Sequence, residues 1–81
     1  MRNGKYLIKV GMNMEKVKIN TEYIKLEQLL KWAGIADSGA NAKAMILDEL
    51  VKVNGNVEIQ RGKKIRPGDK IEINGKIVIV E

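Results

Sequence analysis

Residues 38–69 read SGANAKAMILDELVKVNGNVEIQRGKKIRPGD, and this stretch decides the fold. It predicts a capped helix, then a short strand, an Asn-Gly turn and a basic loop that ends at Pro67-Gly68-Asp69. A helix N-terminus and a cluster of cations are both structures that bind phosphate. Because both occur in one short unit, the sequence suggests a small RNA-binding module.

The helix in this stretch follows a turn at residues 36–39, where Asp37 or Ser38 is the candidate N-cap. Its apolar side chains recur at helical spacing and are expected to face the core: Ala42, Met45, Ile46 and Leu50. Lys43 lies beside that stripe, near the start of the helix, and should reach solvent.

An earlier helix is predicted before the turn. Its apolar positions follow the spacing i, i+3, i+4 and i+7: Leu26, Leu29, Leu30 and Ala33. Thr21 is the candidate N-cap unless Ile24 and Lys25 are still extended, and Gly34 is expected to end the helix. Two short amphipathic helices joined by a brief turn form a helical pair.

Strands are predicted where apolar and charged residues alternate. The expected inward residues are Val17, Ile19, Val51, Val53, Val57, Ile59, Ile71 and Ile73. Residues 69–73 and 76–80 are predicted to form a hairpin around the Asn74-Gly75 turn. The predicted fold class is therefore α+β, with two helices packed on a small, mainly antiparallel β-sheet. Residues 1–13 are expected to be a leader, either flexible or an extra strand, and residues 14–81 a single domain.

The composition limits the function. The 81 residues suit one domain, and the formal net charge of +5 favours polyanionic partners. The chain has no Cys and no His, which excludes disulfides, thiolate zinc sites and Cys or Ser–His nucleophilic catalysis. Its carboxylates show no spacing typical of an acid–base pair or a metal site. We therefore expect no enzyme activity, no cofactor and no metal.

The sequence contains no segment typical of a signal peptide or a membrane span. We accordingly expect a cytoplasmic, monomeric protein with neither a membrane nor a small-molecule substrate as partner.

The basic loop has four cations in six residues: Arg61, Lys63, Lys64 and Arg66. A solvated charged loop is one interpretation. Gly62 frees the backbone and Pro67-Gly68 ends the loop sharply, which favours a shaped surface. We interpret the loop as an RNA-binding surface.

Tyr23 and Trp32 could act as base-stacking platforms, but in a chain without Phe we interpret them as packing residues. Lys25 and Lys31 flank the apolar stripe of the first helix and could extend the basic surface, and the outward-pointing Lys52 could join it. Because the chain has few aromatic residues, we expect it to recognise a folded RNA by its shape and backbone.

These features resemble the S-four RNA-binding domain, named after a ribosomal small-subunit protein, whose helical pair leading into a small sheet is called the alpha-L motif. The resemblance covers about residues 24–74 and rests on KLEQLLK at 25–31, AGIA at 33–36, Ser38, Ala42-Lys43, Ile46, VKVNG at 51–55, Gly68-Asp69, Ile71 and Ile73. GANAK at 39–43 and QRGKK at 60–64 bring the chain closer to the stand-alone bacterial YaaA/YbcJ-like proteins. The resemblance implies a bacterial protein that binds structured RNA, either rRNA or tRNA.

One departure concerns the start of the second helix. Many domains of this family have Ser-Arg where this chain has Ser38-Gly39, so one cation is missing there. The stand-alone group resembles this chain in having Gly. The loop at residues 61–66 thus becomes the main expected contact.

The expected RNA-binding residues are Lys25, Lys31, Ser38, Gly39, Asn41, Lys43, Arg61, Lys63, Lys64 and Arg66. The alternative function is that of a protein–protein adaptor associated with the ribosome or a replication complex. Salt dependence would distinguish the two, because phosphate binding weakens steeply as salt rises.

Overall fold

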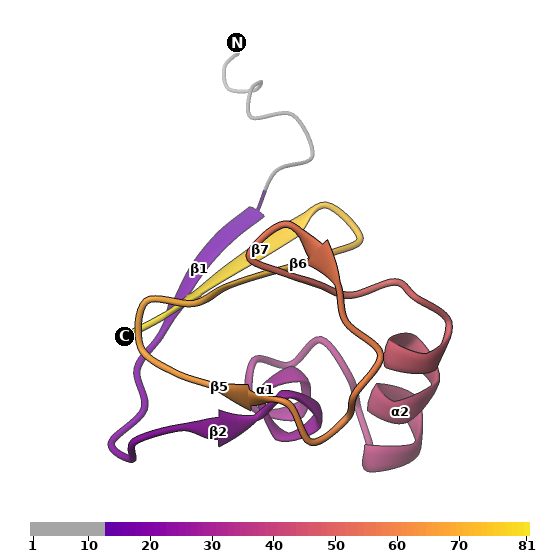
Figure 1. The fold of residues 1–81 in the computed structure, drawn as a ribbon, viewed down its shortest axis with the longest axis horizontal. Coiled ribbons are helices and arrows are strands. Elements are labelled where there is room, and N and C mark those ends of the chain that lie inside the picture. The colour runs from indigo at the N-terminus through magenta and orange to yellow at the C-terminus, as the bar shows by residue number, and fades with distance from the viewer. Residues whose placement is uncertain (1–12) are drawn as a thin grey trace, which may run out of the picture.

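The computed structural model describes residues 13–81, which form a five-stranded sheet, a two-stranded sheet and two helices (Figure 1). The elements in chain order are β1 (Asn13–Val17), β2 (Ile24–Lys25), α1 (Leu26–Trp32), α2 (Gly39–Leu47), β3 (Lys52–Val53), β4 (Asn56–Val57), β5 (Lys64–Ile65), β6 (Lys70–Ile73) and β7 (Lys76–Val80). The larger sheet has the order β1-β7-β6-β3-β4, with β1 parallel to β7 and its other pairs antiparallel. The smaller sheet pairs β2 with β5. The expected α+β class is confirmed.

Two Asn-Gly turns set the register of the antiparallel strands. Asn54 and Gly55 have φ angles of 51° and 89°, and Asn74 and Gly75 have φ angles of 50° and 78°. Two successive left-handed residues make a type I′ turn, whose twist matches that of a hairpin, and Asn and Gly tolerate this conformation best. Both predicted turns are therefore confirmed, as is the final hairpin of β6 and β7.

Helix α1 begins later than its candidate cap indicated. The Thr21 hydroxyl donates to the carbonyl of Tyr23 at 2.9 Å, and Ile24–Lys25 are extended as β2. The helix starts at the next residue without a capping side chain. Its buried stripe is as predicted: Leu26, Leu29 and Leu30. Gly34, with a φ of 75°, follows the helix and turns the chain away.

Helix α2 is capped by Ser38 as predicted, but it ends early. Its buried face comprises Ala42 and Ile46, with Met45 half-buried. The last helical residue is Leu47, and Glu49 adopts a left-handed φ of 62°. Leu50 was predicted to face the core, and this is wrong: it lies beyond the helix and is 45% exposed.

The core lies between the helices and the two sheets (Figure 1). Its buried residues are Val17, Leu26, Leu29, Leu30, Ala36, Ala42, Ile46, Val51, Val53, Ile65, Ile71, Ile73, Val78 and Val80. The predicted inward positions Val57 and Ile59 are wrong, since they are 48% and 55% exposed. The reason is topological: β4 is a two-residue strand at the edge of its sheet.

The start of the chain was predicted to be a leader. Residues 1–12 lie outside the described part of the chain, and Asn13 begins β1. Strand β1 ends at Val17, so the half-buried Ile19 follows it rather than belonging to it. The division into a leader and one domain stays a prediction.

Candidate nucleic-acid interface

The two-stranded ribbon of β2 and β5 carries two lysines side by side. Ile24 pairs with Ile65, and Lys25 pairs with Lys64. Successive side chains of a strand point to opposite faces, so the isoleucines pack inward and both lysines are exposed. Like charges directly opposite each other on neighbouring strands are destabilising. The backbone pairing therefore holds two positive charges together against their repulsion.

The basic loop is attached to the start of α1 through its backbone. The N–H of Leu26 donates to the carbonyl of Lys63 at 2.9 Å, and the N–H of Glu27 donates to that of Arg61 at 3.1 Å. The first N–H groups of a helix have no partner within the helix, and here the loop supplies acceptors in place of a capping side chain. Both cationic side chains are exposed, so the loop backbone is fixed while its charges face solvent.

Tyr23 contacts Lys64, one of the two lysines paired on the β2–β5 ribbon. The Nζ of Lys64 is 4.9 Å from the centre of the Tyr23 ring, which is a cation–π contact. Tyr23 is half-buried, in keeping with the predicted packing role. One face of its ring is covered by Lys64, so that face is not available to stack on a base. Its contribution is to position the lysine, and the sequence pattern alone did not indicate that pairing.

A hydrogen-bond network joins the Asn54-Gly55 turn to the end of the basic loop. The side-chain N–H of Asn54 donates to Asp69 Oδ1 at 3.0 Å, while Asp69 Oδ2 accepts from the backbone N–H of Arg66 at 2.8 Å. The N–H of Lys70 donates to Asn54 Oδ1 at 2.9 Å. The Val-Asn-Gly and Gly-Asp motifs, which are separated in the sequence, are therefore joined by these hydrogen bonds in the fold. Asp69 therefore fixes the backbone at the end of the basic loop.

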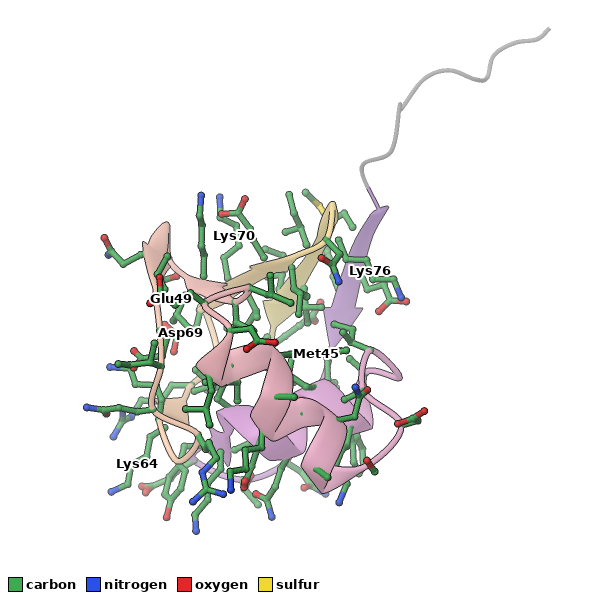
Figure 2. All side chains as sticks on the ribbon, turned by 90° about the vertical axis from the view of Figure 1, so that its right-hand side faces the viewer. Met45, Glu49, Lys64, Asp69, Lys70 and Lys76 are labelled. Carbon is green, nitrogen blue, oxygen red and sulfur yellow. The ribbon has the colours of Figure 1, made fainter. Side chains whose placement is uncertain are left out.

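A polar groove of about 340 Å³ runs beside the network; its lining residues are Val53, Asn54, Asn56, Glu58, Lys63, Lys64, Arg66 and Asp69. The two carboxylates in this lining already accept backbone N–H groups, Glu58 from Gln60 at 3.1 Å and Asp69 from Arg66. Figure 2 shows side chains tipped with nitrogen projecting around Lys64, below the label of Asp69. The exposed cations therefore border a hollow rather than a flat surface.

The start of α2 has a different organisation. Ser38 Oγ accepts from the N–H of Asn41 at 3.0 Å, and Asn41 Oδ1 accepts from the N–H of Asp37 at 3.2 Å. Of these two predicted site residues, Ser38 therefore caps the helix and Asn41 holds the turn that precedes it. A Cβ added at Gly39 would meet nothing within 4 Å, so the missing side chain leaves open space. Lys43 is exposed, as expected.

The structure brings together only part of the predicted site. The β2–β5 ribbon and the attached loop gather Lys25, Arg61, Lys63, Lys64 and Arg66, which we call the cationic ribbon. Lys31 lies in the last turn of α1 and Lys43 on α2, which packs against α1. In Figure 2, α2 crosses the front of the molecule and Lys64 lies at the lower left margin.

Trp32 contradicts its interpretation as a packing residue in the core or half-buried beside it. It is the last residue of α1, and 70% of its side chain is exposed. The periodicity of α1 contained the signal, since Trp32 lies off the stripe of Leu26, Leu29 and Leu30.

Residues 13–81 contain no group of three or more acidic side chains placed to hold a metal ion. No described helix has the length and apolar character needed to cross a membrane.

The fold and the ribbon define the class of protein: a small α+β domain in which a helical pair leads into a sheet, as in the alpha-L motif. A profile of the family described as the S4 domain matches residues 17–81, and the chain belongs to that family. The resemblance stated from the sequence is thus confirmed.

Named relatives refine this assignment. The probable ribosome maturation protein RlbA of Bacillus subtilis (strain 168) is 41% identical over 59 residues, covering 73% of this chain and 83% of the relative. The putative RNA-binding protein YbcJ of Escherichia coli (strain K12) is 40% identical over 58 residues, covering 72% and 83%. The solution structure of E. coli YbcJ, described as revealing an alpha-L motif involved in RNA binding, matches with a TM-score of 0.67 and 35% identity, covering 91% of this chain and 95% of that one.

Proposed function

We propose that this protein binds structured RNA without catalysis and that the cationic ribbon is its main contact surface. The observation that carries the proposal is the register that sets Lys25 directly opposite Lys64. A phosphate bound beside these two lysines offsets the repulsion between their charges, and charge-assisted hydrogen bonds are the stronger kind. The electrostatic energy of the ribbon is therefore lower with a bound polyanion than without one.

The rigidity of the surface favours a folded partner. The loop carbonyls cap α1, and Asp69 holds the backbone N–H of Arg66, so the cations are presented from a fixed backbone. A fixed arrangement of charges matches a fixed arrangement of phosphates, which a folded RNA provides and a flexible single strand does not. The family assignment and the RNA-binding description of YbcJ support RNA as the polyanion.

The finer parts of the proposal rest on the relatives. The name of RlbA favours ribosomal RNA as the target, and with it a cytoplasmic setting. We further propose that the protein acts as a monomer, and that Lys31, Lys43 and the Ser38–Asn41 segment extend the surface along a larger RNA.

The decisive experiment compares two double variants that remove the same charge. Lys63→Gln/Lys64→Gln alters the ribbon, whereas Lys16→Gln/Lys76→Gln alters β1 and β7 in the larger sheet. Affinity for labelled ribosomal RNA fragments is measured by fluorescence anisotropy over a range of salt concentrations. We expect log K to fall less steeply with log salt for the ribbon variant, because each lost phosphate contact makes the negative slope shallower by about 0.7 to 0.9.

The control variant should keep most of its affinity and its slope. Equal losses in the two variants would indicate binding by net charge alone and would contradict the ribbon as a site. Binding that does not change with salt in the unmodified protein would contradict RNA recognition through phosphates.

An adaptor role is a second candidate, and one observation favours it. Three apolar residues flank the β3–β4 pairing, which the hydrogen bond from Glu58 N to Val51 O extends: Leu50, Val57 and Ile59. These three apolar side chains are each between 45% and 55% exposed. Exposed apolar patches mark protein–protein contacts. Replacing Ile59 by Ser should then reduce association with ribosomal particles while leaving binding to free RNA unchanged.

A further inference from the structure

Trp32 stands at the edge of an apolar groove. The groove has a volume of about 480 Å³, and its lining residues are Lys18, Ile19, Asn20, Thr21, Ile24 and Trp32. The segment after β1 forms one side, while β2 and the end of α1 form the other. A volume of this size lies within the range of small-molecule sites in proteins, which is roughly 300 to 1,000 Å³.

The lining has the chemistry of a nucleobase site. Trp32 offers an exposed aromatic face, and the half-buried Ile19 and Ile24 offer aliphatic surface. Asn20 carries an amide that can both donate and accept hydrogen bonds, as the edge of a base requires. Lys18 adds a positive charge, and no carboxylate is among the lining residues. Apolar faces, one amide and one cation together suit a flat heterocycle attached to a phosphate.

The groove and the cationic ribbon share strand β2. Ile24 lines the groove, and the next residue, Lys25, pairs with Lys64 on the ribbon. Consecutive Cα atoms are about 3.8 Å apart, so the two surfaces lie on the two faces of one short strand. The Thr21 hydroxyl also donates to the carbonyl of Tyr23, whose ring lies against the Lys64 ammonium. Phosphates on the ribbon would therefore have their nucleotides within reach of the groove.

We infer that the Trp32 groove receives one unstacked nucleobase of an RNA whose phosphates lie on the cationic ribbon. The inference rests on the proposed function and deepens it, because it names the substrate class: RNA in which a paired stem adjoins an unpaired nucleotide. Trp32 stacks on the base, the two isoleucines exclude water from it, and Asn20 contacts its edge.

The chain provides its own reporter, since Trp32 is its single tryptophan. The full chain is titrated with a short RNA hairpin that carries a bulge of unpaired adenosines, and with the same stem fully paired. We expect the bulged hairpin to quench Trp32 emission and the paired stem to leave it nearly unchanged. Stacking on an aromatic side chain changes affinity by about 5- to 150-fold per base, so Trp32→Ala should weaken the bulged hairpin by that factor.

Matched variants keep the result interpretable. Trp32→Phe retains an aromatic face and should recover part of the affinity. Because Trp32 is mostly exposed, its replacement should leave the thermal midpoint of unfolding nearly unchanged. Asn20→Ala should lower discrimination among bulged bases more than it lowers overall affinity.

The outcomes separate this inference from the proposed function. If Lys63→Gln/Lys64→Gln abolishes binding while Trp32 emission and the affinity of Trp32→Ala stay unchanged, the groove assignment is overturned and the ribbon stands. If neither hairpin nor ribosomal RNA binds at low salt, both fail. If Trp32 emission shifts with protein concentration alone, in step with a doubled mass, a second copy of the chain occupies the groove and the inference is wrong.

Discussion

The cationic ribbon and the start of α2 are two regions that the sequence marked as sites for phosphate, with the loop of the ribbon as the main expected contact. In the ribbon, strand pairing forces Lys25 and Lys64 together, and the loop backbone is fixed on α1. At the start of α2, Ser38 already caps the helix, Asn41 accepts from the backbone N–H of Asp37, and Gly39 adds no charge. The comparison teaches that a site for phosphate depends on cations gathered on an exposed surface, and not on polar residues as such.

The largest expected effect tests this contrast directly. Lys64→Glu places a carboxylate in the middle of the ribbon, whereas Lys43→Glu makes the same change on exposed α2. Loss of a charged hydrogen bond changes affinity by about 10- to 150-fold, so Lys64→Glu should weaken RNA binding by at least that factor. Lys43→Glu should weaken it by less than half as much in free energy, as measured by anisotropy at fixed salt. The reverse order would transfer the main site to α2.

The second prediction concerns how the ribbon is held. Asp69→Ala leaves the Arg66 N–H and the Asn54 side-chain amide without their acceptor. We expect the free energy of unfolding to fall by about 1 to 3 kcal/mol in urea denaturation. Asp48→Ala, at the exposed end of α2, should change it by no more than about 0.5 kcal/mol. Equal stability of the two variants would mean that the network does not hold the loop.

The smallest effect sharpens the other side of the comparison. Gly39 is the first residue of α2 and has open space around it, so Gly39→Arg should fold without strain. The added cation should raise affinity for ribosomal RNA by about 2- to 5-fold, roughly the worth of one exposed ion pair. Gly39→Ala removes the glycine without adding charge and is the matched control. If both variants bind alike, the start of α2 does not face the RNA.

Local patterns predicted much of the molecule. The Asn54-Gly55 and Asn74-Gly75 turns, the Ser38 cap and the buried leucines of α1 were all correct. Each depends on residues a few positions apart: a turn needs left-handed residues, a cap needs one acceptor, and a stripe needs helical spacing. The family resemblance added that the Val-Asn-Gly and Gly-Asp motifs belong to one domain.

The errors have two physical origins, one remote in sequence and one local. Thr21 does not cap α1, because backbone carbonyls of the distant loop accept the first N–H groups of the helix. Leu50 and Val57 are exposed because α2 ends early and β4 lies at a sheet edge. Trp32 is exposed because the core is already filled by the leucine stripe. For Thr21 and Val57 the outcome depended on a neighbour that is remote in sequence, whereas the early end of α2 and the position of Trp32 off the stripe of α1 are local.

The sequence by itself determined the turns, the helical pair, the excess of positive charge and the class of ligand that this charge suits. The tertiary structure alone decided which cations act together, because the pairing of Lys25 with Lys64 joins residues 39 positions apart. It also decided that Trp32 faces solvent beside them. Charge and local conformation are properties of the chain, whereas the gathering of exposed charges arises only when distant strands pair and the core closes beneath them.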